Sequence, residues 1–332
     1  MDASLPELVA ALRSSRGLRE KAPIALVREV FGASDWLGGP GDDGAVVAGG
    51  EGSLVVGGEA ILPAFVARDP FGAGVAAVLA NVNDLAAMGA VPLAIVDTVV
   101  ADEDTARRAL EGMRYASGLY DVPVVGGHLT RHDGPPSVSA FGLGRAQQVL
   151  SVRHAAPGQS LVLACVTEGT MRPDFPFFPS FDERGDRLAG DVRTLARVAV
   201  GGACVAARDV SMAGMVGSLA MLLECHRLGV TVDLDAIPVP AGVALADWLV
   251  AFPCFAFLLC VPPGREDDCA RPFLERGIQA PVIGTLDGTG EVALSTGGRR
   301  EVVVDLRTEA VTGLSTGNLA GFVGPGPTNP AN

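Results

Sequence analysis

Two adjacent carboxylates stand in a glycine-rich stretch near the start of the chain, which reads Gly41-Asp42-Asp43-Gly44-Ala45. Neighbouring ionised carboxylates repel each other, so they need a cation or hydrogen-bond donors close by. Mg²⁺ takes carboxylate oxygens as ligands and shares its remaining positions with phosphates. A solvated turn is the alternative, because Gly-Asp-Asp-Gly is also a good turn sequence. Both Asp42 and Asp43 are therefore candidate metal ligands.

A second candidate carboxylate lies in a segment of small and apolar residues, Phe71 to Ala90, which predicts a helix. Asn81 and Asp84 are three positions apart and so share one face of that helix. An ionised aspartate among Ala, Val, Leu and Met is costly to bury unless it is paired or binds a metal. A polar stripe facing water is the alternative, but Asn83 is the only other polar residue after Gly74. The pattern favours binding roles for Asn81 and Asp84.

Two glycines and a histidine follow a short β-branched strand predicted over residues 122–125. Gly126 and Gly127 let backbone N–H groups approach phosphate oxygens, and His128 or Thr130 adds a donor. A plain turn between strand and loop is the alternative interpretation.

The last candidate is Asp209, in the run Asp209-Val210-Ser211 that leads into a helix predicted over residues 212–228. Ser211 is suited to cap that helix. Anions and metal-bound phosphates are favoured at a helix N-terminus, which is why Asp209 is of interest there. A simple helix-start residue is the alternative.

Size and charge limit the classes of function. The chain has 332 residues, more than one hydrophobic core usually serves, and 48% of them are apolar. The net charge of −13 argues against DNA or RNA as a partner, because phosphate backbones attract basic surfaces. Lys21 is the only lysine, so no Gly-Lys-Ser/Thr loop of the Walker-A type exists. A nucleotide site must work without one.

Cysteine spacing and the terminal residues suggest a cytoplasmic protein. None of the 6 cysteines forms a C-x-x-C pair, which suits reduced thiols better than a disulfide framework or a zinc site. The start, Met1 to Glu20, lacks the layout of a signal peptide. The most apolar run, Trp248 to Val261, is too short to span a bilayer and contains Pro253. We expect no membrane association.

The order of predicted elements is mixed α/β, with two domains. A turn at residues 156–159 precedes a new apolar strand, and we place the domain boundary there. The expected division is an N-terminal domain over residues 1–153, a C-terminal α/β domain over 154–310 and a flexible tail over 311–332. Predicted strands cover 54–57, 93–100, 122–125, 138–144, 161–166, 230–234 and 255–261, and predicted helices cover 71–90, 104–119, 191–200, 212–228, 241–250 and 265–276.

Taken in order, these motifs closely resemble one superfamily. They are Gly-Asp-Asp-Gly-Ala, a helix ending Asn-Asp-Leu-Ala-Ala-Met-Gly-Ala-x-Pro, a strand into Gly-Gly-His, and Asp-Val-Ser-x-x-Gly opening a helix. This is the PurM-like superfamily of aminoimidazole-ribonucleotide synthetase, thiamine-monophosphate kinase, selenophosphate synthetase and a hydrogenase maturation factor. The resemblance runs from about residue 38 to about residue 305, and it is most specific over residues 81–92.

The resemblance implies ATP and Mg²⁺ as cofactors. Carried over, Asp43, Asp84 and Asp209 become metal ligands, with Asp42 as a further candidate. It also implies a two-domain fold in which the N-terminal sheet pairs with its twin across a homodimer, next to a separate C-terminal α/β domain. The ATP phosphates would lie along Gly126, Gly127, His128 and Asn81.

Departures from the named enzymes narrow the resemblance, and the Asp-Val-Ser-Met-Ala-Gly form at residues 209–214 and the run Trp248 to Pro253 look more like the uncharacterised AIR synthase-related branch. Selenophosphate synthetases need a reactive Cys or Sec and a Lys near the start, whereas here the first cysteine is Cys165 and Lys21 lies outside any such motif. The hydrogenase maturation factor acts through a C-terminal cysteine, which is absent here. Residues 58–63 replace the Asp-Gly-Val-Gly-Thr-Lys of aminoimidazole-ribonucleotide synthetase. The acceptor substrate is thus not readable from these motifs.

The leading hypothesis is a kinase- or synthetase-like enzyme, a transferase or ligase, that uses MgATP to phosphorylate or activate a small substrate. One alternative is a nucleotide-binding subunit with no chemistry of its own that serves a partner enzyme. Another is a metal-dependent hydrolase that uses the acidic cluster without ATP.

Overall fold

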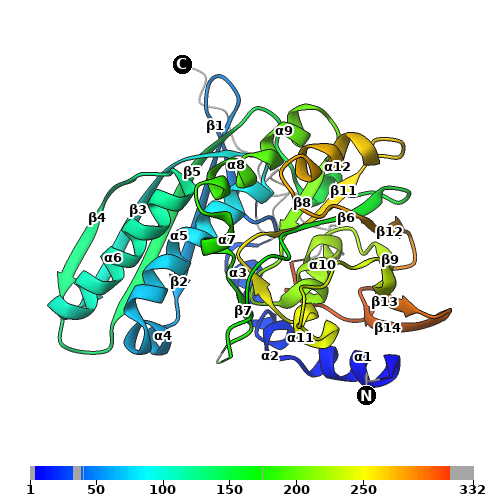
Figure 1. Ribbon diagram of the computed structural model, residues 1–332, viewed down its shortest axis with the longest axis horizontal. Coiled ribbons are helices and arrows are strands. Elements are labelled where there is room, and N and C mark those ends of the chain that lie inside the picture. Colours follow the sequence, from blue (N-terminus) through cyan, green and yellow to red (C-terminus); the bar gives the residue numbers. More distant parts are fainter. Residues whose placement is uncertain (1–3, 33–38, 40, 174, 315–332) are drawn as a thin grey trace.

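Two β-sheets with flanking helices organise the chain (Figure 1). The computed structural model describes residues 4–32, 39, 41–173 and 175–314. The first sheet has five strands in the order β1-β2-β5-β3-β4, and the second has seven in the order β14-β13-β9-β12-β6-β11-β8. A two-stranded pair, β10-β7, completes the set. The predicted mixed α/β fold with two sheets is confirmed.

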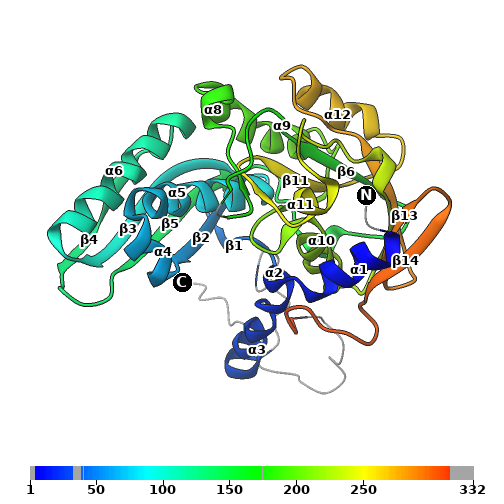
Figure 2. The ribbon, with the colours of Figure 1, turned by 60° about the horizontal axis from the view of Figure 1, so that its bottom comes forward.

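The first sheet is antiparallel except at one edge, where β4 runs parallel to β3. Two long helices, α5 (Pro70–Ala87) and α6 (Glu103–Tyr120), lie on one face of the sheet (Figure 2). Inward and outward side chains alternate along β3, with Ile95 and Val99 buried and Leu93 and Val96 exposed, as expected for a sheet covered on one side. Its strands are β1 (Ala45–Ala48), β2 (Ser53–Ile61), β3 (Val91–Ala101), β4 (Val124–Arg131) and β5 (Ser137–Ala146).

Helix α5 is held in place by its cap and by close packing against α6. The Asp69 side chain accepts a hydrogen bond from the Gly72 N–H at 2.8 Å, which satisfies a free donor at the helix start. A Cβ atom at Gly74 would lie 1.9 Å from the Ala109 carbonyl oxygen, and one at Gly112 would lie 2.0 Å from that of Phe71. Glycine at both crossings therefore lets the two backbones touch, and this fixes the first turns of α5 against α6.

The second sheet contains short strands, and two neighbouring strands within it, β6 and β11, are wholly buried. Its strands are β6 (Ser160–Cys165), β8 (Ala206–Asp209), β9 (Gly229–Asp233), β11 (Ala256–Val261), β12 (Val282–Asp287), β13 (Glu291–Thr296) and β14 (Arg299–Asp305), beside the pair β7 (Phe177–Phe178) and β10 (Phe252–Pro253). The associated helices are α7 (Phe181–Arg184), α8 (Arg187–Val192), α9 (Thr194–Val200), α10 (Gly214–Glu224), α11 (Leu245–Leu249) and α12 (Glu266–Leu274). Short helices α4 (Pro63–Arg68), η2 (Val152–His154) and η3 (Leu234–Ala236) connect the larger elements.

The two sheet units share a hydrophobic core. Ile61 and Val99 of the first sheet belong to the same buried cluster as Leu195 and Phe257 of the second unit. The boundary predicted between residues 153 and 154 falls between β5 and β6, where the chain passes from one sheet to the other. A junction with a continuous core holds side chains from both units in fixed relative positions.

The N-terminal helices pack on the second unit, although they precede the first sheet in the sequence. Leu5, Leu8, Val9 and Leu12 of α1 (Leu5–Ser14) join the buried cluster of the second sheet. Helices α2 (Arg16–Arg19), η1 (Ala22–Ile24) and α3 (Ala25–Phe31) follow. Helix α1 falls within the predicted N-terminal domain, residues 1–153, but the apolar side of α1 is buried against the second sheet.

The C-terminal end of the described chain is anchored by one buried carboxylate. Glu224 accepts hydrogen bonds from the backbone N–H groups of Val311, Thr312 and Gly313 and from the Thr312 hydroxyl. The first residues of the predicted flexible tail are therefore fixed in place. The rest of that tail, residues 315–332, lies outside the described residues.

A separate property concerns membranes. Among the residues that the structure describes, no helix combines the length and apolar character that a bilayer crossing requires.

Candidate metal centre

Three of the predicted carboxylates meet where the two sheet units join. Carboxylate oxygens of Asp43, Asp84 and Asp209 all lie within 4.8 Å of one another. Asp43 precedes β1, Asp84 stands in the last turn of α5, and Asp209 ends β8. Three segments distant in the sequence thus bring their acids to one place, which is the arrangement of a cation site.

Among the residues that the structure describes, one cation, Arg208, is bonded to the cluster. Arg208 donates from Nη2 to Asp43 Oδ1 at 2.9 Å and from Nη1 to the Gly41 carbonyl oxygen at 2.9 Å. The Asp209 backbone N–H donates to Asp43 Oδ2 at 3.2 Å. The carboxylate of Asp84, by contrast, has no hydrogen bond or ion pair with any other residue in the described part of the chain.

Burial raises the pKa of all three acids, and repulsion by neighbouring carboxylates adds to this effect for Asp84 and Asp209. Burial first, and then the neighbouring Asp43, raise the pKa of Asp209 to about 8, against the opposing effect of Arg208. The pKa of Asp84 is raised well above its usual value by burial first and then by Asp209 and Asp43. Burial also raises the pKa of Asp43, against the effect of Arg208. One arginine does not balance these acids, so a divalent cation fits the cluster in charge and in donor type.

Asn81 lies one helical turn before Asp84 and faces the same strand. A Cβ atom placed on Gly57 of β2 would be 3.7 Å from Asn81 Oδ1 and 3.9 Å from Asp84 Cβ. Asn81 Nδ2 donates to the carbonyl oxygens of Ala77 at 2.8 Å and Ala140 at 3.1 Å. Its Oδ1 is buried and accepts no hydrogen bond from the described residues. Burial of Asn81 rules out the solvated polar stripe and leaves an amide oxygen free for a ligand.

The Asp42 carboxylate accepts hydrogen bonds from a different set of donors than the Asp43 carboxylate. Its Oδ2 accepts from the Ser151 hydroxyl at 2.7 Å, and its Oδ1 accepts from the Val152 N–H at 2.7 Å. Both oxygens therefore tie the loop to the connection between the sheet units. The structure brings Asp43 into the cluster, and the metal role of Asp42 stays a prediction.

Gly126, Gly127 and His128 lie on the edge strand β4, away from the cluster. Strands β3 and β5 separate β4 from β2, so about 14 Å of sheet lies between these residues and Gly57. A Cβ atom at Gly127 would lie 2.6 Å from Asp97 Cγ on β3, which explains why this position needs glycine. The contact of Gly126, Gly127 and His128 with ATP phosphates stays a prediction.

Two charged residues that the motifs did not indicate lie near the cluster. Glu59, on β2, raises the pKa of Asp84 and of Asp209, and burial raises its own pKa. Lys21 opposes the burial effect on the pKa of Asp43 and Asp209. The sequence held one indication for each residue. Glu59 alternates in β2 with the buried Val55 and Ile61, so its side chain was expected to point inward. Lys21 stands out because it is the only lysine in the sequence.

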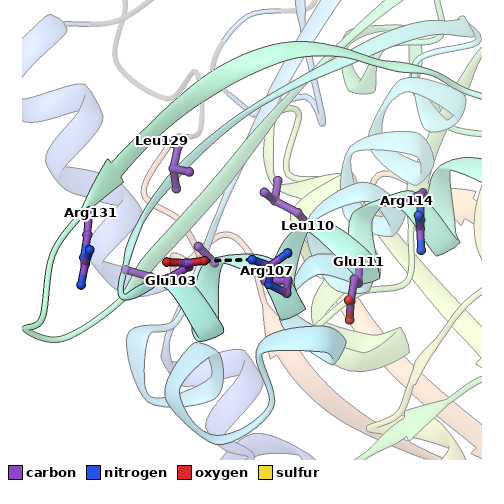
Figure 3. A pocket seen from close by; sticks show the side chains of 9 residues that line it. Glu103, Arg107, Leu110, Glu111, Arg114, Leu129 and Arg131 are labelled. Atoms are coloured by element: carbon purple, nitrogen blue, oxygen red, sulfur yellow. Dashed lines mark hydrogen bonds and ion pairs between the residues drawn. The ribbon is translucent and has the colours of Figure 1, made fainter.

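A separate hollow of about 630 Å³ opens between α6 and β4 (Figure 3). Glu103 and Arg107 form an ion pair of 2.9 Å inside it. None of the predicted site residues lines this hollow, and it is distinct from the acidic cluster. Its lining residues are Ala101, Glu103, Ala106, Arg107, Leu110, Glu111, Arg114, Leu129 and Arg131.

Family models match both sheet units. The N-terminal domain model of the AIR synthase related proteins matches residues 41–146, and the C-terminal domain model matches residues 164–296. The chain belongs to the AIR synthase related family, within the PurM-like superfamily.

Full-length relatives include an uncharacterised protein. A Synechocystis protein is 32% identical over 319 residues, which cover 94% of this chain and 99% of the relative. The PurL subunit of phosphoribosylformylglycinamidine synthase from Synechocystis is 26% identical over 245 residues, 66% of this chain but only 32% of PurL. The chain thus spans about a third of that larger subunit.

Solved structures share the fold at low sequence identity. PurL of Thermotoga maritima complexed with FGAR gives a TM-score of 0.74 at 16% identity, covering 92% of this chain and 53% of PurL. AaThiL complexed with AMPPCP and TMP gives 0.63 at 17% identity, covering 84% and 95%. The HypE-HypF complex gives 0.67 at 19% identity, covering 84% and 99%.

Proposed function

We propose that this protein is a Mg²⁺-dependent ATP-binding enzyme that phosphorylates or activates a small substrate. The observation that carries the proposal is the three-carboxylate cluster of Asp43, Asp84 and Asp209 at the junction of the sheet units. The nucleotide complexes of its structural neighbours, PurL with ATP or ADP and AaThiL with AMPPCP, support it. As in other phosphoryl transfers, the bond from the terminal phosphorus to the bridging oxygen breaks, a bond to a substrate oxygen forms, and ADP leaves.

The chain's own residues divide the work of holding metal and nucleotide. Asp43, Asp84 and Asp209 would hold Mg²⁺, and Arg208 fixes the orientation of Asp43 through its 2.9 Å ion pair. Bound Mg²⁺ supplies positive charge that offsets the charge on the phosphates during transfer. Asn81 stands one helical turn before Asp84, and its buried Oδ1, which accepts no hydrogen bond from the described residues, is the further polar atom that we assign to the same ligand.

Calorimetric titration tests the proposal directly. We expect ATP to bind with Mg²⁺ present and to bind at least tenfold more weakly without it, since the acids repel bare phosphate. Asp209→Asn should abolish the Mg²⁺-dependent binding, whereas Asp267→Asn, an exposed acid on α12, should not. Absence of ATP binding under both conditions would overturn the proposal.

Activity assays then separate the two alternatives. A nucleotide-binding subunit would bind MgATP but release no phosphate with any added acceptor. A metal-dependent hydrolase would bind Mg²⁺ with the same affinity in the presence and absence of ATP and would cleave its substrate without nucleotide. Phosphate release that requires MgATP and rises with an acceptor identifies the proposed enzyme.

We also propose a homodimer through the outer face of the first sheet, over residues 54–60, 93–100 and 138–144. That face carries exposed apolar side chains, including Leu93 and Val96, each 41% exposed, and Phe141, 43% exposed. Val96 and Phe141 are direct partners across β3 and β5, so they form one continuous apolar patch. Light scattering should give twice the chain mass, and a monomer mass at all concentrations would contradict it.

A further inference from the structure

The hollow between α6 and β4 exists because α6 covers β3 and leaves the edge strand bare. Parallel pairing sets Leu129 beside Val99 and Arg131 beside Ala101, so these four side chains share one face of the sheet. Val99 and Ala101 are buried, whereas Leu129 is 57% exposed and Arg131 is exposed as well. Helix α6 thus shields the inner strand only, and its side chains form the other wall of the hollow (Figure 3).

The spacing of residues along α6 decides which side chains line this wall. Its buried positions are mostly small, and at one of them, Gly112, the helix backbone touches the backbone of α5 at Phe71. The positions that line the hollow recur at intervals of three and four residues, so they form one stripe along the helix. They are Glu103, Arg107, Leu110, Glu111 and Arg114.

The hollow carries an excess of positive charge. Each of its two glutamates is paired with an arginine of α6, at 2.9 Å and 2.7 Å. The side chains of Arg114 and Arg131 line the hollow and make no ion pair or hydrogen bond within the described chain. Arg131 lies at one end of the view in Figure 3 and Arg114 at the other, with Leu110 and Leu129 between them. Two unpaired cations thus flank an apolar floor in a chain whose net charge is −13.

We propose that this hollow binds an elongated organic dianion, whose apolar middle rests on Leu110 and Leu129 and whose carboxylate ends meet Arg114 and Arg131. A guanidinium group stays charged at any ordinary pH and binds a carboxylate through two parallel N–H donors. The volume of about 630 Å³ lies in the usual range for small-molecule sites, which combine an apolar lining with a few polar groups. The protein would thus have a second small-molecule site, separate from the acidic cluster.

A series of matched probes tests the chemistry of the site. Suberate is a linear dicarboxylate, its diol analogue carries hydroxyls in place of both carboxylates, and succinate has the same charges on a shorter chain. Titration calorimetry on the full chain at low salt should show suberate binding at least about tenfold more tightly than the diol, because the diol cannot form charge-assisted bonds. Suberate should also bind at least about fivefold more tightly than succinate, because succinate has less apolar surface to bury.

Substitutions locate the binding in the hollow. Arg114→Gln and Arg131→Gln should each weaken suberate binding about three- to tenfold, a modest loss because both groups are exposed to solvent and salt. The double variant should bind suberate no more tightly than the diol. Leu129→Asn should weaken both suberate and the diol, since it removes apolar contact surface. Arg197→Gln, which removes an exposed arginine on α9 of the second unit, should change neither affinity.

Three results would overturn the proposal. They are no binding of suberate at about 10 mM, equal affinity for suberate and the diol, and unchanged suberate affinity in the double variant. Thermal melting checks that each variant is folded. None of these results depends on the proposed function, because Asp43, Asp84 and Asp209 do not line the hollow.

Discussion

Acidic side chains in two regions of this protein differ in the number of cations bonded to them. In the second unit, Asp191 is fully buried between two arginines, with Arg184 Nε at 2.8 Å from Oδ2 and Arg276 Nε at 2.6 Å from Oδ1. At the junction of the sheets, the carboxylates of the acidic cluster lie within 4.8 Å of one another. Within the described part of the chain, Arg208 is the one cation bonded to them. The residue type is the same in both places, although Asp43 and Asp84 are less deeply buried than Asp191, and the supply of positive charge differs.

This difference separates an acid whose charge is neutralised within the chain from acids that we propose to bind a cation. Asp191 links α8 to the end of α12, and its charge is matched within the chain. The junction acids keep an excess of negative charge, which a folded protein tolerates where an external cation completes the site. The shortage of bonded cations around these clustered carboxylates therefore distinguishes the candidate site from the Asp191 region.

The largest expected effect concerns the matched acid. Asp191→Asn should lower the free energy of unfolding by about 3 kcal/mol or more, because it leaves the buried Arg184 with the half-exposed Glu168, 3.8 Å away, in place of its close buried partner. Urea unfolding followed by circular dichroism measures this loss. Folded protein should still bind MgATP as before, since Asp191 lies outside the acidic cluster. A loss below about 1 kcal/mol would show that buried charge pairing is not what stabilises this region.

A smaller effect is expected from pH on the metal-free protein. The pKa of Asp209 is about 8 in the folded chain against an ordinary 3.8, so folding favours its protonated form. The stability that this proton provides is complete below about pH 4 and is lost as pH rises through about 8. The free energy of unfolding should thus fall by about 2 kcal/mol between about pH 6 and pH 8.

Two controls sharpen the pH experiment. Asp209→Asn should flatten the decline, because the amide does not titrate. Saturating Mg²⁺ should also flatten it, since the metal replaces protons as the source of positive charge. A free energy of unfolding that rises with pH over the same range would contradict the raised pKa.

Much of the fold was predictable because its elements carry strong local signals. The predicted helices over 71–90 and 104–119 correspond to α5 and α6. The strand predicted over 122–125, however, continues as β4 to Arg131, through two glycines that normally favour turns. The parallel ladder with β3 sustains it there, and the Asp97 side chain occupies the space beside Gly127. That support is tertiary and leaves no local signature.

The candidate site was predictable in part for the same reason. Asp43, Asp84 and Asp209 stand in recognisable motifs, and the structure brings them together. Glu59 and Lys21 stand in no motif, and their proximity arises only when β2 and the N-terminal segment pack around the junction. Helix α10 begins at Gly214, so Ser211 does not cap it as predicted, and the Ser211 N–H instead donates to the Ser218 hydroxyl.

The smallest expected change in stability, and the sharpest contrast with Asp191, comes from Asp84→Asn. The amide keeps the shape of the side chain and removes one of the crowded charges. Because the Asp84 carboxylate bonds to no described residue and is repelled by Asp209, Asp43 and Glu59, the metal-free protein should lose no stability and gain up to about 1 kcal/mol. Binding of MgATP should nevertheless be abolished, since a metal ligand is gone.

Melting curves and MgATP titrations on Asp84→Asn and Asp191→Asn, measured side by side, complete the comparison. The first variant should keep its melting temperature and lose the ligand, and the second should lose melting temperature and keep the ligand. An Asp84→Asn protein with a lower melting temperature and unchanged affinity would remove Asp84 from the site. It would also weaken the metal roles of Asp43 and Asp209, because the case for those two depends on the same cluster of excess charge.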